Sequence, residues 1–174
     1  GELREGARPA AMKLLVWNCR GMQKLAAVRA LLGVQERIKP DVLFLSETHL
    51  DKAKAGKLRR RLGYDEMEVL ESDGRSGGLT MLWQSSLGVS SRAVHANYID
   101  IQIKEVTPAG WRFTGFYGKP SSDRKYLSWE YLRGLKALAD LPWLVAGDFN
   151  EILQAHEKDG GAARPQRGMQ AFSS

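Results

Sequence analysis

The sequence predicts an α+β domain in which two mixed β-sheets pack face to face and helices cover their outer sides. The order of the predicted elements supports this class: strand–helix–strand–helix is followed by a run of consecutive strands, then by a helix and a strand. The middle strands lack the crossover helices that parallel neighbours need, which excludes a purely parallel, doubly wound sheet. No repeat, linker or low-complexity stretch divides the 174 residues, so we expect one domain.

Two short apolar strands alternate with two helices at the start of the predicted fold. The strands are expected at Lys13–Asn18 and Val42–Leu45, because each is a compact apolar run that ends on polar residues. Apolar residues at helical spacing predict a helix over Lys24–Lys39, which ends before a proline. A second, basic helix is predicted over Lys52–Leu62, and Gly63 closes it.

The middle of the chain is predicted to be a succession of strands joined by turns. These strands are Tyr64–Leu70, Leu79–Trp83, Leu87–His95, Tyr98–Val106 and Trp111–Tyr117. The fourth alternates isoleucine with polar residues, which is typical of a half-buried strand. Glycine-rich clusters at Asp73–Gly78 and Pro108–Gly110 are expected to form turns.

The last part of the chain is predicted to hold one more helix and one more strand. Ser121–Asp123 can cap a helix that runs to about Ala139, and Trp143–Gly147 reads as a buried strand. Residues 151–174 are expected to be loop, with a short helix near Gln170. At the other end, residues 1–11 carry charges and a proline, and we expect a disordered tail that precedes the domain at 12–174.

The composition favours a polyanionic partner and excludes several classes of protein. The net charge is +6 and the isoelectric point is near 9.5, which is typical of proteins that bind DNA or RNA. Cys19 is the only cysteine, so an internal disulfide and a cysteine-based zinc site are excluded. No apolar run approaches the roughly 20 residues that cross a bilayer.

Polar side chains stand at the ends of three predicted strands. Asn18 ends the first, Glu47 follows the second, and Asp148 and Asn150 follow the last. Strand ends are rigid, so these groups can converge in one cleft, and carboxylate and amide oxygens suit Mg²⁺. Taken singly, Asn18 is equally a turn residue, Glu47 a turn cap, and the Asp148 segment a plain strand-to-loop turn.

The predicted basic helix carries a second candidate site. Its cations are Lys52, Lys54, Lys57, Arg59, Arg60 and Arg61. They form either a solvated helix face or a contact to the nucleic-acid backbone, and the sequence alone leaves both interpretations open.

Four motifs in order resemble the endonuclease/exonuclease/phosphatase superfamily, which includes DNase I and exonuclease III-type apurinic endonucleases. They are Trp17–Gly21, Ser46–Thr48, Gly115–Gly118 and Gly147–Glu151. Three further segments resemble the endonuclease domain of plant non-LTR (LINE-type) retrotransposons: Gly74–Leu79, Trp111–Gly118 and Glu157–Gly161. The resemblance implies a DNase I-like four-layer α/β sandwich that hydrolyses phosphodiesters with Mg²⁺, or with Mn²⁺ as an alternative.

The resemblance also implies a role for each candidate residue. Glu47 would bind the metal with Asn18 beside it, and Tyr117 would contact the scissile phosphate, unless it is only a core aromatic at a strand end. Asp148 would orient and activate the attacking water, and Asn150 would hold that water or a phosphate oxygen. The resemblance implies that the protein is a monomer that contacts the backbone of DNA and does not associate with a membrane. It also implies a location in the nucleus or the cytoplasm, and a reverse transcriptase in the parent element that is absent from this chain.

Two departures from the family pattern shape these expectations. Arg20 stands where some apurinic endonucleases have an acidic residue, which argues against abasic-site preference. The family's terminal Ser-Asp-His motif is missing, and neither His49 nor His156 replaces it. We therefore expect a domain incomplete at its C-terminus and inactive by itself. The alternatives are a binding-only nucleic-acid remnant, or a phosphatase or lipid phosphodiesterase of the same superfamily.

Overall fold

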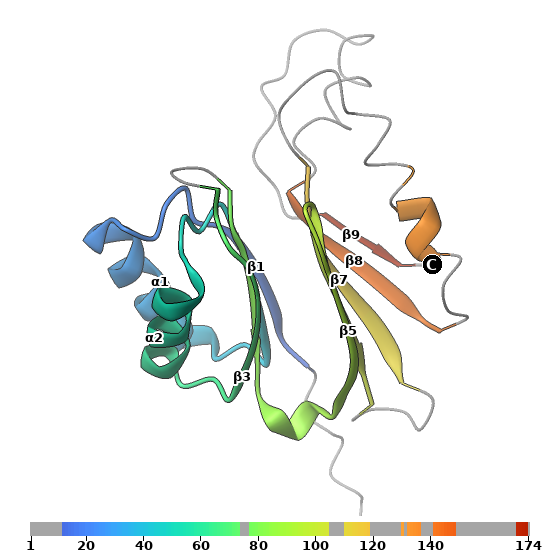
Figure 1. Cartoon of the computed structure of the whole chain (residues 1–174). Coiled ribbons are helices and arrows are strands. Elements are labelled where there is room, and N and C mark those ends of the chain that lie inside the picture. The colour runs from blue at the N-terminus through green and yellow to red at the C-terminus, as the bar shows by residue number, and fades with distance from the viewer. Residues whose placement is uncertain are drawn as a thin grey trace, which may run out of the picture.

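A computed structural model of the chain shows two β-sheets that face each other, with helices on both outer sides (Figure 1). It describes residues 12–73, 77–104, 110–118, 130, 132–136 and 141–148, and the backbone of 170–173. The predicted tail at 1–11 lies outside these residues. The layer order is helices, first sheet, second sheet and a short helical segment, so the predicted fold class is confirmed.

The first sheet is built from the N-terminal half of the chain. Its strands are β1 (Leu14–Asn18), β2 (Val42–Ser46), β4 (Leu79–Trp83) and β3 (Glu66–Leu70), in the order β1-β2-β4-β3. β1 and β2 are parallel, and the other pairs are antiparallel. The parallel pair needs a crossover, which the helix between them supplies.

Helices α1 (Leu25–Ile38) and α2 (Lys52–Leu62) cover the outer face of the first sheet (Figure 1). The side chain of Asp51 caps α2 by accepting a hydrogen bond from the Lys54 amide at 2.8 Å. Gly63 ends α2 in the left-handed conformation, with φ of 81°. Both ends of α2 are therefore fixed by local sequence: the end at Gly63 was predicted, and the cap at Asp51 was not.

The second sheet has the order β5-β6-β7-β8-β9 and is also mixed. Its strands are β5 (Val89–His95), β6 (Tyr98–Ile103), β7 (Trp111–Tyr117), β8 (Trp143–Asp148) and β9 (Gln170–Ser173). β7 and β8 are parallel, while the other pairs are antiparallel. The short 3-10 helix η1 (Ser85–Leu87), which the sequence did not predict, joins the two sheets.

The main core lies between the two sheets and is formed by alternating residues of each strand. On β6 the isoleucines are fully buried and the residues between them are not, as the sequence pattern predicted. Other large members of this core are Phe44, Met81, Trp83 and Phe113. The sheets approach so closely that a Cβ on Gly115 would lie 2.3 Å from the Phe44 ring. Each large side chain buried here contributes roughly 1.5–3 kcal/mol.

The predicted element boundaries hold over most of the chain, with one error. Segment Gln170–Ser173 is strand β9, antiparallel to β8, so the short helix predicted near Gln170 is wrong. Four residues carry too little periodicity to separate helix from strand, and the free edge of β8 decides the outcome. The helix predicted from Ser121 is seen at 130 and 132–136, and the rest of it lies outside the described residues. Among the described helices, none combines the length and apolar character that crossing a bilayer requires.

Candidate active site

Two parallel strand pairs, one in each sheet, bring their carboxyl ends to the candidate site. In the first sheet Asn18 is the register partner of Ser46, directly before Glu47. In the second sheet Tyr117 is the register partner of Asp148. The predicted site residues Asn18, Glu47, Tyr117 and Asp148 therefore come from four separate segments that meet where the sheets face each other.

The side chains of Asn18 and Asp148 join the two sheets directly. Asn18 Nδ2 donates a hydrogen bond to Asp148 Oδ2 at 2.8 Å. The amide of Arg20 donates to Asn18 Oδ1 at 3.1 Å, which fixes the orientation of the Asn18 side chain. The contact aims the nitrogen of Asn18 at the carboxylate and so holds Asp148 in one position.

A second bridge between the sheets is formed by Glu47 and Tyr117. The Tyr117 hydroxyl donates a short hydrogen bond to Glu47 Oε1. Burial raises the pKa of Tyr117 above its ordinary value, and the hydrogen bond to Glu47 and the charges of Glu47 and Asp148 raise it further. The phenol therefore stays protonated at neutral pH. Because the charges of Glu47 and Asp148 both raise the pKa of Tyr117, the two bridges belong to one site.

The backbone around Tyr117 and Asp148 is fixed by contacts that the sequence analysis did not anticipate. Asn97 brackets Tyr117: its carbonyl accepts from the Tyr117 amide at 2.7 Å and its Nδ2 donates to the Tyr117 carbonyl at 3.0 Å. The Gly118 amide donates to the Asp148 carbonyl at 2.8 Å. At Gly147 a Cβ would lie 1.8 Å from the Phe116 carbonyl oxygen, so only glycine fits before Asp148. Asn97 stands in a turn, and nothing in its local sequence distinguishes it.

The donor set fits a hard divalent cation. No cluster of three or more His, Cys, Asp or Glu side chains occurs among the described residues, which does not suit zinc. Mg²⁺ is usually held by only one or two carboxylates and keeps several waters. Glu47 offers one such carboxylate at the strand-end site. Beside Asn18, the fully buried Ser46 hydroxyl has no hydrogen-bond partner in the described structure and suits a metal-bound water.

Cys19 does not belong to the donor set. Its pKa is raised to about 12, first by burial and then by the charge of Glu47. The thiol is therefore protonated at neutral pH, and the side chain packs in the core between the first sheet and its helices, in one cluster with Leu43 and Leu45.

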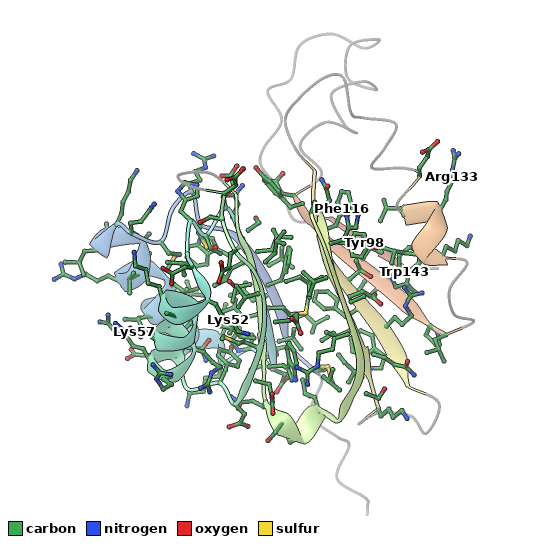
Figure 2. The ribbon with its side chains drawn as sticks, viewed as in Figure 1. Lys52, Lys57, Tyr98, Phe116, Arg133 and Trp143 are labelled. Atoms are coloured by element: carbon green, nitrogen blue, oxygen red, sulfur yellow. The ribbon has the colours of Figure 1, made fainter. Side chains whose placement is uncertain are left out.

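The basic helix lies apart from the strand-end site, on the outer side of the first sheet (Figure 2). Arg59 donates to the carbonyls of Tyr64 and Asp65 at 2.7 and 3.1 Å, and so it also fixes the chain after α2. The other five cations are exposed to solvent: Lys52, Lys54, Lys57, Arg60 and Arg61. No acidic residue occurs within α2 to neutralise them.

Of the predicted catalytic and metal residues, only Asn150 lies outside the described structure. His49 is half-buried beside the loop that follows β1, and its backbone is left-handed with φ of 54°. Gly77 and Gly78 hold the loop that carries Glu47, through the amides of His49 and Thr48 respectively. The sequence predicted a turn at this glycine pair and a family resemblance around it, but no contact with the Glu47 loop. The pair itself was the available signal, because adjacent glycines often mark close backbone contact.

Comparison with known proteins agrees with this geometry. Residues 15–170 match the Endonuclease/Exonuclease/phosphatase family. The chain belongs to this family, whose fold is the DNase I-like sandwich. No curated protein matches the chain in sequence.

Solved structures support the same fold. An AP endonuclease from Archaeoglobus fulgidus superposes with a TM-score of 0.60 at 16% identity, covering 80% of this chain and 58% of that one. D. rerio TDP2 complexed with a single-strand DNA product gives 0.62 at 21%, with coverage of 80% and 60%. A 3′ phosphatase, NExo, from Neisseria bound to a product DNA hairpin gives 0.58 at 18%, with coverage of 80% and 58%. The chain thus spans 58–60% of the length of these proteins.

Proposed function

We propose that this chain carries the metal-binding and water-activating part of a Mg²⁺-dependent phosphodiester hydrolase that acts on DNA. The observation that carries the proposal is the pair of bridges Glu47–Tyr117 and Asn18–Asp148, which gather two carboxylates, a phenol and an amide at one end of the sandwich. This set matches the needs of hydrolysis at phosphorus: a cation site, a general base and neutral donors for phosphate oxygens.

Each residue has a distinct task in the proposed reaction. Bound Mg²⁺ would supply positive charge to the phosphate oxygens, with Glu47 as its carboxylate ligand and Asn18 beside it. The Tyr117 hydroxyl has one proton, which it donates to Glu47 in this structure; with Glu47 on the cation, the hydroxyl would donate this proton to an oxygen of the scissile phosphate instead. Asp148, oriented by Asn18, accepts a proton from the attacking water. Asn150 holds that water or a phosphate oxygen.

DNA is the proposed substrate for reasons of charge and motif. The solved TDP2 and NExo structures contain DNA products. The chain has a net charge of +6, and its motifs at Gly74–Leu79, Trp111–Gly118 and Glu157–Gly161 resemble LINE-type retrotransposon endonucleases. We therefore propose that the chain descends from a LINE-type retrotransposon whose parent element also encodes a reverse transcriptase. We propose in addition that the nuclease is a monomer.

A nicking assay with supercoiled plasmid and Mg²⁺ tests this proposal. The chain by itself is expected to be inactive, so the assay uses a form of the protein that includes the Ser-Asp-His segment. Nicking by this form should fall by roughly 10²–10⁴-fold in Asp148→Asn, because the general base is lost. Glu36→Gln is the matched control, since it removes an exposed carboxylate from α1, and it should nick like the wild type. Nicking that survives both Asp148→Asn and Glu47→Gln would contradict the proposal. The absence of both nicking and any stabilisation by Mg²⁺ would contradict it as well.

A second candidate function is nucleic-acid binding without cleavage, and the exposed cations of α2 favour it. These side chains would contact phosphates, so binding should weaken steeply with salt. The double variant Lys57→Gln/Arg60→Gln should lower the slope of log K against log salt by about 1.8 on duplex DNA, at about 0.9 per contact. The control pair Arg133→Gln/Lys136→Gln lies on the opposite outer side of the molecule and should leave the slope unchanged (Figure 2). Salt-dependent binding without nicking would favour this function over hydrolysis, and equal slopes in both double variants would exclude α2 as the contact.

A further inference from the structure

Backbone hydrogen bonds join three loops around Glu47. On one side, the amides of Gly21 and Met22 donate to the carbonyls of Glu47 and Thr48 at 2.8 and 2.9 Å. On the other side, the amides of Thr48 and His49 donate to the carbonyls of Gly78 and Gly77 at 3.2 and 3.0 Å. Segment 47–49 is thus the middle strand of a short backbone ladder, which continues the order β1-β2-β4 beyond the ends of these strands.

This central segment has a conformation that it cannot hold by itself. Glu47 and His49 both have left-handed backbones, with φ of 50° and 54°. Non-glycine residues adopt this region at a cost and persist there only when the surroundings determine it. The fully buried Thr48 between them is bonded on both sides, so the ladder supplies that constraint.

The two glycines on the β4 side differ in what their missing side chains allow. Both are left-handed, with φ of 74° at Gly77 and 92° at Gly78. A Cβ at Gly77 would meet nothing within 4 Å. A Cβ at Gly78 would lie 2.4 Å from Thr48 Oγ1 and 3.2 Å from the His49 amide nitrogen. The missing side chain of Gly77 therefore serves only the left-handed turn, whereas that of Gly78 also makes room for the segment that holds Glu47.

We propose that Gly78 is a positioning residue for the Glu47 carboxylate, acting through direct contact with Thr48. The inference rests on the proposed function, in which Glu47 is the metal ligand. A side chain at position 78 crowds Thr48 Oγ1 and the His49 amide. A shift of Thr48 moves Glu47, its neighbour in the chain, and strains the hydrogen bond that the Gly21 amide donates to the Glu47 carbonyl. A displacement of about 1 Å at a catalytic group can lower a rate by about 10²-fold.

The test compares Gly78→Ala with its neighbour Gly77→Ala. Both variants place alanine at a left-handed position, so both should lower the urea midpoint of unfolding, and Gly78→Ala should lower it further because its Cβ also crowds Thr48. Only Gly78→Ala should raise the Mg²⁺ concentration for half-maximal nicking, by about 10-fold or more, and reduce the rate at saturating Mg²⁺ by about 10²-fold. Equal effects of the two variants on the Mg²⁺ midpoint would overturn the proposal.

A compensating change identifies the contact. In Gly78→Ala/Thr48→Ala the oxygen nearest to the new Cβ is removed, so the Mg²⁺ midpoint should return to that of Thr48→Ala alone. A general loss of folding at Gly78→Ala would not be rescued in this way. A double variant that stays as impaired as Gly78→Ala would therefore count against the steric route through Thr48.

Amide hydrogen exchange without metal separates this inference from the proposed function. In Gly78→Ala the amides of Gly21 and Met22, on the far side of the ladder, should exchange about 10-fold faster or more, while Gly77→Ala leaves them protected. If the wild type shows no Mg²⁺ effect but the exchange pattern appears, the hydrolase proposal fails and the positioning by Gly78 stands. If Gly21 and Met22 stay protected in Gly78→Ala, the positioning role is wrong whatever the nicking assay shows.

Discussion

Two partly buried carboxylates of this protein, Asp100 and Glu47, differ in the charge of the groups that donate hydrogen bonds to them. Asp100 lies on β6, on the outer face of the second sheet, and accepts hydrogen bonds from Arg112 at 3.3 Å and from the Thr114 hydroxyl at 2.5 Å. Glu47 lies at the strand-end site, and its hydrogen bond comes from the neutral phenol of Tyr117. The first carboxylate has its countercharge within the chain, whereas among the described residues the second is hydrogen-bonded by a neutral donor alone.

The Asp100 cluster is closed in charge and in hydrogen bonding. Arg112 Nη1 donates to the Leu135 carbonyl at 2.6 Å, which ties the helical segment 132–136 to the sheet. Trp143 Nε1 donates to Thr114 Oγ1 at 2.8 Å, and the Arg112 guanidinium lies over the Trp143 ring at 5.4 Å. Burial raises the pKa of Asp100 above its ordinary value, and the hydrogen bonds from Thr114 and Arg112 and the charge of Arg112 offset only part of this rise.

The contrast shows how the same chemical group serves structure in one place and ligand binding in another. A carboxylate that is removed from water needs a partner of opposite charge, and a site that lacks one within the chain is suited to an external cation. The two clusters should therefore respond differently to mutation and to Mg²⁺.

The largest expected effect is the loss of the internal countercharge. Arg112→Met leaves Asp100 buried without its guanidinium and frees the Leu135 carbonyl, so we expect a loss of roughly 3–5 kcal/mol in the free energy of unfolding. Urea denaturation measures it. The control is Arg92→Met, which breaks the half-exposed pair with Glu68 at 3.8 Å and the contact of Arg92 over the Trp83 ring at 5.3 Å, and should cost about 1 kcal/mol. Equal costs for the two variants would show that the Asp100 cluster does not stabilise the fold.

The next effect concerns the external cation. With Mg²⁺ at about 100 times its dissociation constant, the wild type should gain about 2.7 kcal/mol of stability. Glu47→Gln should abolish most of this gain, because the carboxylate ligand is lost, while Glu68→Gln on β3 should keep it. Thermal unfolding with and without Mg²⁺ provides the measurement. A Glu47→Gln protein that Mg²⁺ still stabilises fully would place the cation elsewhere.

The smallest expected effect is a loss of folding stability at alkaline pH, and it is due to the Tyr117 hydroxyl. Its pKa is raised in the fold above the ordinary value of 10.0, so the folded state keeps a proton that the unfolded chain releases. The associated stability is complete below about pH 10 and is lost as the pH rises, at about 1.4 kcal/mol per pH unit. Tyr64, with a pKa of about 12, adds a similar decline. The stability of Tyr117→Phe should therefore fall less steeply with pH above pH 10, because one tyrosine fewer releases a proton on unfolding. An unchanged slope would contradict the burial of this phenol.

The sequence predicted most of this architecture because its signals are local. The apolar runs of β1 and β2, the end of α2 at Gly63, and the alternation along β6 are each contained within a few residues. The strand-end positions of Asn18, Glu47 and Asp148 followed from the same runs. A site at the strand ends could therefore be predicted with some detail.

What the sequence could not supply depends on contacts between distant segments. The left-handed backbone of Glu47 is set by Gly21 and Gly78, and the role of Asn97 depends on β7 lying against its turn. The assignment of Gln170–Ser173 to a strand depends on the open edge of β8. The internal pairing of Asp100 with Arg112 depends on the β6–β7 register, in which the two residues are diagonal neighbours.

The distance along the chain between the bridging residues sets an order of folding. Every strand of the first sheet lies between Leu14 and Trp83, so this sheet can form while the later strands are still being synthesised. Glu47 meets Tyr117 across 70 residues, and Asn18 meets Asp148 across 130. Contacts of such long range are slow to form, because the loop must close before the contact stabilises it. The Asn18–Asp148 hydrogen bond can therefore form only after the two sheets have docked, and only then do the carboxylates of Glu47 and Asp148 come together.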